Sequence, residues 1–322
     1  MSLKAFRTLI ASRRLFNNWL SAGLKYFLIK HKLQKGDITV KCNDRSFRLP
    51  PKIYSWLANA WHDNVIRNFS CSDLISCDLY DACKIVIDNK GIFLKTPDGI
   101  LLHLDENNPN SVIFTVVETW LYDIHFLDFD LSDWLVIDVG AFIGDTALYY
   151  AKRGAIVVAV EPVPSNYQAM LRNLELNPNL KQKILPVNAA VAGVDGYVDI
   201  TYESPVDGSA TIYGKGRHVA RVRSLTLKNL LNQVNLDLNM FKVKALKMDC
   251  KGCEYDIIFN ETEVLKLFDI VKIEYSGYLR NRTVHEILSV LEKDGFKCRI
   301  WAHNNLALMI GLDKHGTLTG IK

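Results

Sequence analysis

The stretch Val136-Ile-Asp-Val-Gly-Ala-Phe-Ile-Gly-Asp-Thr146 decides the fold of this chain. Its first part belongs to an apolar run over residues 134–138, which is typical of a strand buried on both faces. Gly140 and Gly144 then allow a tight turn in which the backbone can come close to a ligand. A helix is expected to begin where the stretch ends. Open α/β sheets bind ligands at this position, outside the carboxyl ends of the strands.

Downstream of this stretch, apolar runs and amphipathic segments alternate. The alternation predicts a doubly wound, mostly parallel, Rossmann-like α/β sheet with crossover helices on both faces. Strands are expected over residues 134–138, 155–160, 184–191, 243–248 and 270–273, and helices over 146–153, 166–176, 224–234 and 283–293. Residues 196–224 read as a hairpin insertion, and residues 298–301 and 306–310 as a final antiparallel hairpin.

The N-terminal part of the chain has a different pattern. Residues 1–35 form a basic segment, in which apolar spacings of three and four predict one amphipathic helix over residues 3–33. Such a helix can pack on its own domain, lie on an anionic membrane or contact a protein partner. Residues 36–110 predict a small mixed α/β extension whose clearest part is an antiparallel meander over residues 84–104. The main domain is expected over residues 111–322, beginning with a helix over residues 111–127.

Composition and charge exclude several classes of protein. With 49% hydrophobic and 23% charged residues, the chain is neither disordered nor of low complexity. The net charge is +4, but the first 36 residues hold eight basic residues and no acid, so the remainder is slightly acidic. The main domain therefore lacks the basic character of a nucleic-acid-binding fold. No apolar run is long enough for a membrane span, and the absence of a recognisable signal peptide predicts a cytoplasmic protein, at most peripheral at the inner membrane surface.

The seven cysteines are odd in number and irregularly spaced. Together with the expected cytoplasmic location, this predicts reduced thiols. Cys250 and Cys253 form one Cys-x-x-Cys pair, and two buried, unreactive thiols are the expected state. A zinc site or a redox pair is the alternative.

The chemistry of the glycine-containing stretch favours one cofactor. Dinucleotide sites use Gly-x-Gly-x-x-Gly, whereas this stretch reads Asp-x-Gly-x-x-x-Gly and carries carboxylates at Asp138 and Asp145. These acids would repel a pyrophosphate but suit the cationic amino-acid moiety of S-adenosylmethionine. Glu161 ends the second strand, where an acid can accept hydrogen bonds from ribose hydroxyls. Asn188 ends the third strand and is expected near the adenine edge.

Four motifs in this order resemble the FkbM-type S-adenosylmethionine-dependent methyltransferases. They are Asp138-Val-Gly-Ala-Phe-Ile-Gly-Asp-Thr146, Glu161-Pro-Val-Pro-Ser-Asn-Tyr167, Asn188-Ala-Ala-Val191 and Lys247-Met-Asp-Cys-Lys-Gly-Cys-Glu254. The resemblance covers about residues 111–302, and the first hundred residues match no pattern of the family. It implies a methyltransferase whose acceptor is a hydroxyl of a saccharide, glycolipid or secondary metabolite. The candidate cofactor-binding residues are Asp138, Gly140, Ala141, Gly144, Asp145, Thr146, Glu161, Pro162, Asn166, Asn188 and Ala189.

The candidate catalytic residues lie at the ends of the fourth and fifth strands. They are Asp249, Lys251, Glu254 and Glu274. Lys251 stands where the family pattern Asp-x-Glu-Gly-x-Glu usually has a glutamate, and it could act as a base with a lowered pKa or bind a carboxylate of the acceptor. Asp249 and Glu254 could instead coordinate a divalent cation or bind backbone amides.

Two alternatives to this function remain open. The first is a nucleic-acid methyltransferase, although Met248-Asp249-Cys250 does not resemble the strand end that holds an exocyclic amine. The second is a non-catalytic protein that docks on a membrane or partner and keeps a degenerate cofactor fold.

Overall fold

A computed structural model describes the protein at residues 3–106, 108–122, 130–302 and 305–322. The chain divides into two compact units, residues 1–121 (unit 1) and residues 122–322 (unit 2). Among the described residues, no helix combines the length and the apolar character needed to cross a bilayer.

Unit 1 begins with two helices, so the single helix predicted over residues 3–33 is wrong. They are α1 (Leu3–Ser12) and α2 (Trp19–Lys30). Between them, the Asn18 side chain accepts a hydrogen bond from the backbone N–H of Lys41 at 2.6 Å and donates one to the carbonyl of Thr39 at 3.0 Å. These bonds tie the chain to strand β1 (Ile38–Cys42), which is why helical geometry stops here.

The rest of unit 1 is built from small antiparallel sheets. Strand β1 pairs with β2 (Arg45–Leu49), and α3 (Pro51–His62) follows. A five-stranded sheet then contains β3 (Ile66–Cys71), β4 (Ile75–Leu79), β5 (Cys83–Asp88), β6 (Gly91–Lys95) and β7 (Leu101–His103). The predicted meander is confirmed as β5, β6 and β7. The unit ends with α4 (Pro109–Val116) and a π-helix (Val117–Leu121), and residues 123–127 of the predicted helix lie outside the described residues.

Unit 2 contains a seven-stranded sheet in the order β10-β9-β8-β14-β15-β17-β16. The first five strands in this order pair in parallel, and β17 is antiparallel to both of its neighbours. Their bounds are β8 (Trp134–Val139), β9 (Ile156–Val160), β10 (Ile184–Val187), β14 (Val243–Met248), β15 (Ile270–Ser276), β16 (Lys297–Trp301) and β17 (His315–Ile321). The chain order reverses between β8 and β14, and ligands bind at such a switch point in open α/β sheets. The predicted mostly parallel sheet with an antiparallel end is confirmed.

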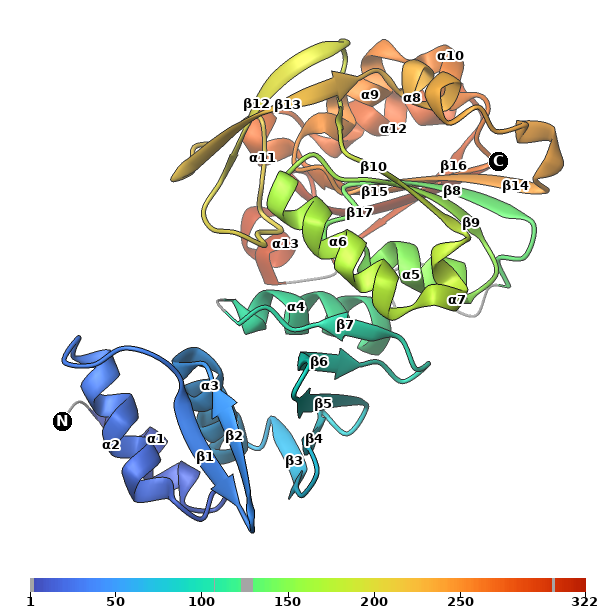
Figure 1. Ribbon diagram of the computed structural model, residues 1–322. Coiled ribbons are helices and arrows are strands. Elements are labelled where there is room, and N and C mark those ends of the chain that lie inside the picture. Colours follow the sequence, from blue (N-terminus) through green and yellow to red (C-terminus); the bar gives the residue numbers. More distant parts are fainter. Residues whose placement is uncertain (1–2, 107, 123–129, 303–304) are drawn as a thin grey trace. The chain divides into compact units, whose positions relative to one another are not determined.

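Helices cover both faces of this sheet (Figure 1). On one face lie α5 (Asp145–Lys152), α6 (Pro164–Leu176) and α7 (Pro178–Lys181), and on the other α8 (Leu227–Val234), α9 (Cys253–Asn260), α10 (Thr262–Leu265) and α12 (Val284–Lys293). Strands β12 (Gly196–Tyr202) and β13 (His218–Leu225) form the predicted hairpin insertion and pair with the short β11 (Ala190–Val191). A 3₁₀ helix (Leu238–Met240), α11 (Gly277–Arg280) and α13 (Asn305–Ile310) complete the unit.

Three sequence-based boundaries are corrected by the structure. Residues 306–310 form helix α13 and not a strand, because a short apolar run does not separate the two states. The partner of β16 is instead β17. Its threonines and glycines interrupt the apolar pattern by which a strand is recognised in the sequence. The expected third strand over residues 184–191 is divided between β10 and β11, and the helix expected from Ser224 begins at Leu227 after the N-cap Thr226.

Candidate functional site

A glycine-containing loop, residues 139–146, connects β8 to α5 at the switch point of the sheet. Gly140 has φ +81° and Gly144 has φ +79°, so both use the left-handed conformation that favours glycine. The backbone N–H groups of Gly140 and Ala141 both donate to the carbonyl of Val160, at 2.9 and 3.0 Å. The loop is therefore held against the end of β9, which places it beside Glu161.

A buried ion pair lies beneath this loop. Lys247 of β14 bonds to Asp138 at 2.8 Å, and its Nζ also donates to the carbonyl of Gly140 at 3.0 Å. The second oxygen of Asp138 accepts a hydrogen bond from Thr146 at 2.5 Å. Burial alone would lower the pKa of Lys247, but the negative charges of Asp138 and Asp249 raise it above the ordinary lysine value. Asp138 thus fixes the loop through contacts within the protein.

Glu161 is buried and lies at the centre of a polar network. Its Oε2 accepts a hydrogen bond from the N–H of Phe142 at 3.0 Å, and its Oε1 accepts from the N–H of Val163 at 2.9 Å and from Asn166 at 3.2 Å. Burial raises the pKa of Glu161 to about 7, although the hydrogen bonds favour the charged form. A carboxylate has about four acceptor positions, and these three bonds leave one on Oε2.

The other candidate cofactor residues gather around the same two strand ends. Asn188 donates to the backbone carbonyl of Glu161 at 2.8 Å. Asn166 also bonds to the carbonyl of Asp207 at 2.9 Å, in the insertion between β12 and β13. Eight of the eleven candidates are buried, namely Asp138, Ala141, Gly144, Asp145, Thr146, Glu161, Asn166 and Ala189. Those that lie in the glycine loop, Ala141, Gly144, Asp145 and Thr146, contribute mainly to its shape, because protein atoms surround them in place of solvent.

The candidate catalytic residues meet at the ends of β14 and β15. Lys251 bonds to Asp249 at 2.7 Å and to Glu274 at 2.6 Å. Burial would lower the pKa of Lys251, but the two carboxylates raise it well above its usual value. This direction contradicts the interpretation of Lys251 as a base with a lowered pKa. The side chain is 20% exposed and engaged by both carboxylates.

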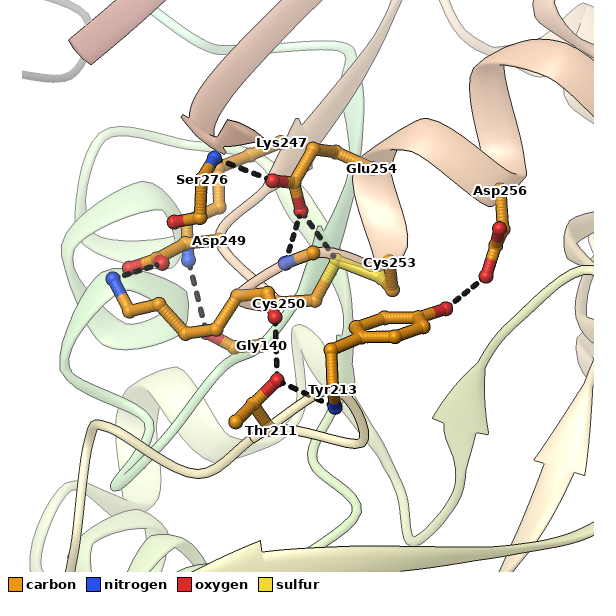
Figure 2. The surroundings of a disulfide bond; sticks show 12 residues. Gly140, Thr211, Tyr213, Lys247, Asp249, Cys250, Cys253, Glu254, Asp256 and Ser276 are labelled. Carbon is orange, nitrogen blue, oxygen red and sulfur yellow. Dashed lines mark hydrogen bonds and ion pairs between the residues drawn. A yellow bond between two sulfur atoms is a disulfide. The ribbon is translucent and has the colours of Figure 1, made fainter. Parts of the chain in front are cut away.

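Glu254 is fully buried at the start of α9. Its carboxylate accepts hydrogen bonds from the backbone N–H of Gly252 at 2.8 Å and from that of Ser276 at 2.6 Å. Burial raises the pKa of Glu254 to about 7. The residue therefore joins the ends of β14 and β15 through backbone amides, and Figure 2 shows it turned toward Ser276.

The methyltransferase FkbM domain model matches residues 138–298, which is half of the chain and spans all the residues of this site. The chain belongs to the FkbM methyltransferase family. A comparison with curated protein sequences finds no match. The FkbM family implies S-adenosylmethionine as the methyl donor.

Solved structures similar to this FkbM chain share little sequence with it. They include methyltransferase FkbM from Methylobacillus flagellatus KT, with 14% identity over 67% of this chain and 54% of that chain, at a TM-score of 0.41. Precorrin-6y C5,15-methyltransferase from Geobacter metallireducens GS-15 has 11% identity over 61% and 83%, at 0.34. The fibrillarin pre-rRNA processing protein of Methanococcus jannaschii has 14% identity over 80% and 96%, at 0.37. This chain therefore spans about half the length of the FkbM structure it matches.

A disulfide closes the turn at residues 249–254 of this FkbM domain, so the predicted reduced pair is wrong. Cys250 and Cys253 are joined, and a second disulfide joins Cys42 to Cys71 in unit 1. The three remaining cysteines, Cys77, Cys83 and Cys298, are free. Lys251 has φ +50° between the joined residues, a conformation that is uncommon outside glycine. The disulfide therefore encloses the residue that departs from the family pattern.

Replacing Cys250 and Cys253 by serine is expected to loosen this turn locally and to change the stability of the whole protein only modestly. A sequence separation of three closes a very short loop, so chain entropy predicts a loss of only about 2 kcal/mol of unfolding free energy. Without the disulfide, Lys251 is expected to leave its left-handed conformation. Hydrogen exchange at the Gly252 and Ser276 amides, which bond to Glu254, should become faster than in the wild type.

The matched control is the double serine variant of Cys42 and Cys71. It should leave exchange at Gly252 unchanged, because that disulfide lies in unit 1. Unchanged exchange at Gly252 in the Cys250 and Cys253 variant would show that the disulfide does not maintain the turn.

The insertion supplies residues that sequence reasoning missed. Thr211 donates to the carbonyl of Lys251 at 2.6 Å, and the Tyr213 hydroxyl bonds to Asp256 (Figure 2). Arg280 lies 3.9 Å from the Tyr213 ring centre and pairs with Asp256 at 2.9 Å. These residues come from three separate segments, and no local motif marks them. Lys247 was detectable, because a lysine inside a buried strand requires an acidic partner.

Proposed function

We propose that this protein transfers a methyl group from S-adenosylmethionine to a hydroxyl of a saccharide, glycolipid or secondary metabolite. The observation that carries the proposal is Glu161. It lies at the switch point beside the glycine loop and keeps one acceptor position on Oε2. A ribose hydroxyl is a donor that suits this position. The hydroxyl acceptor comes from the family resemblance.

The two groups of residues are proposed to have different roles, one binding the methyl donor and the other acting on the acceptor. The glycine loop, Glu161, Asn166 and Asn188 would hold the donor, whose sulfonium provides an activated methyl carbon. The protein must then orient the acceptor oxygen and remove its proton.

Asp249 and Glu274 are the carboxylates proposed to receive that proton, since Glu254 is held by backbone amides. The side chains of Asp249 and Glu274 are 30% and 14% exposed, whereas Glu254 is fully buried. Lys251 lies between the two and bonds to both, at 2.7 Å to Asp249 and 2.6 Å to Glu274, so it holds them in place. In this role Lys251 is a positioning residue and not the base.

The first experiment is a calorimetric titration with S-adenosylhomocysteine, which needs no acceptor. The affinity of the wild type is expected to rise roughly tenfold between pH 6 and pH 8. The reason is that Glu161, with a pKa of about 7, changes from mostly protonated to mostly ionised over this range. The ionised carboxylate is the stronger hydrogen-bond acceptor. Glu161→Gln should weaken binding about 10- to 100-fold at pH 8 and abolish the pH dependence.

Glu261→Gln is the matched control. Glu261 is also buried and accepts two backbone N–H bonds, from Leu227 at 2.6 Å and Lys228 at 2.7 Å. These two residues are the first of helix α8, so Glu261 binds the start of that helix and not the glycine loop. This variant should lose stability and keep the affinity of the wild type. Equal affinity in the Glu161→Gln variant would contradict the ribose contact. If the wild type shows no saturable binding of S-adenosylhomocysteine, the proposed function is wrong.

The raised pKa values of Glu161 and Glu254 also predict the direction in which the free energy of unfolding changes with pH. Both groups hold a proton in the folded state between pH 4.5 and about 7, where the unfolded chain has lost it. Their contribution to stability is therefore complete below pH 4.5 and is lost as the pH rises through 7. Unfolding in urea should accordingly require less denaturant at pH 8 than at pH 5.5, and Glu161→Gln should reduce this difference.

A further inference from the structure

Helix α2 presents two large apolar side chains to solvent. Leu20 and Leu24 are 61% and 60% exposed, and Phe27 and Leu28 are only half-buried. The spacing of these four residues places them on one face of the helix. In an ordinary amphipathic helix of a globular protein, such an apolar stripe faces the core. Here Leu20 and Leu24 on this face are exposed.

The inner face of α2 explains this arrangement. The buried residues of the helix are Ala22 and Gly23. A Cβ on Gly23 would lie 2.2 Å from Cδ1 of Leu9, so α1 crosses α2 closely at this position. Ala22 and Gly23, together with Tyr26 against Tyr54, make the contact inside unit 1, whereas Leu20 and Leu24 lie outside it. Helix α1 adds a second exposed apolar pair, Phe6 and Ile10, which are four residues apart.

The basic residues around α2 favour an anionic partner. Residues 1–36 contain eight basic residues and no acid. Arg14, Lys32 and Lys35 are exposed near the two ends of α2, and Lys25 is half-buried within the helix. An apolar helix face flanked by cations fits the boundary between anionic headgroups and acyl chains. A twelve-residue helix is too short to cross the membrane, which leaves binding at the surface.

We propose that α2 binds the surface of membranes that contain anionic lipid. Leu20 and Leu24 insert among the acyl chains, and the cations near the ends of the helix contact the headgroups. This inference is independent of methyl transfer and of the acceptor, because it concerns a surface within unit 1. It goes beyond the proposed function by assigning the protein a site of attachment.

The test is sedimentation of the full-length protein with vesicles. The protein should bind vesicles made of equal parts phosphatidylcholine and phosphatidylglycerol, should not bind vesicles of phosphatidylcholine alone, and should bind less as salt is added. The double variant Leu20→Glu, Leu24→Glu should lower the fraction bound to anionic vesicles about tenfold or more, because it removes apolar area and adds negative charge. Both positions are exposed, so the circular dichroism spectrum and the thermal midpoint should match those of the wild type.

The matched control is Leu308→Glu. Leu308 is 72% exposed on α13 of unit 2, so the substitution also adds a charge in place of an exposed leucine. It should leave vesicle binding unchanged. Two outcomes overturn the proposal: vesicle binding that the double variant does not reduce, or no binding to anionic vesicles at all. If the wild type shows no vesicle binding and forms a dimer that the double variant dissociates, the stripe is an interface between two copies of the chain.

Discussion

Replacing Lys247 by methionine is expected to lower the free energy of unfolding by about 3–5 kcal/mol. The side chain is buried and bonds to Asp138 at 2.8 Å, and Asp138 is fully buried. The substitution leaves a charged or newly protonated carboxyl group without its cation, and the cost of burying that group is what destabilises the protein. The variant also loses the bond from Nζ to the carbonyl of Gly140, so the glycine loop should become mobile. Urea denaturation followed by circular dichroism measures the change.

Two further variants separate this explanation from a general loss of packing. In the double variant Asp138→Asn, Lys247→Met, both charges are gone and much of the stability should return. Lys244→Met is the matched control on the same strand. Lys244 pairs with Asp269 at 3.2 Å, but the pair is partly exposed, so its loss should cost less than about 1 kcal/mol. If the double variant is no more stable than Lys247→Met, the buried charge is not the cause.

Elements with a strong local pattern were predictable from the sequence. The strand over residues 134–138 and the meander over residues 84–104 are confirmed, because continuous apolar runs and turn residues report directly on buried strands and tight turns. The glycine loop and Glu161 could also be predicted, since both follow a strand end in the chain. These features depend on neighbours within a few residues.

The errors arose where distant segments decide the outcome. The break between α1 and α2 depends on bonds from Asn18 to β1, about twenty residues away. The β16 partner is β17, and the apolar segment 306–310 forms a helix. The disulfide between Cys42 and Cys71 requires β1 and β3 to meet. Burial would lower the pKa of Lys251, and Asp249 and Glu274 raise it. Asp249 is two residues away, but Glu274 lies on a neighbouring strand, and no local pattern places it beside Lys251.

Replacing Gly140 by alanine is expected to abolish cofactor binding, with a loss of affinity for S-adenosylhomocysteine of more than about 100-fold. A Cβ at this position would lie 2.1 Å from the carbonyl oxygen and 2.8 Å from the carbonyl carbon of Asp249. The contact is with backbone, which cannot rotate away as a flexible side chain could. The N–H of Asp249 also donates to the carbonyl of Val139 at 2.9 Å, so the end of β14 can move only by breaking that bond. The glycine loop must therefore move relative to Asp249, and its contacts with Val160 and Glu161 are displaced with it. A displacement of this kind removes the geometry on which ligand binding depends.

Gly295→Ala isolates the steric contact from the backbone strain. Gly295 has φ +90°, similar to the +81° of Gly140, and a Cβ there would meet no atom within 4 Å. Both variants carry the strain of a left-handed alanine, about 1–2 kcal/mol, but only Gly140→Ala also collides with Asp249. Calorimetry should therefore find wild-type affinity in Gly295→Ala, and denaturation should find Gly140→Ala less stable than Gly295→Ala. If both variants bind S-adenosylhomocysteine as the wild type does, the glycine loop does not hold the cofactor. If both lose binding equally, strain in the fold and not the close approach of β8 to β14 accounts for the effect.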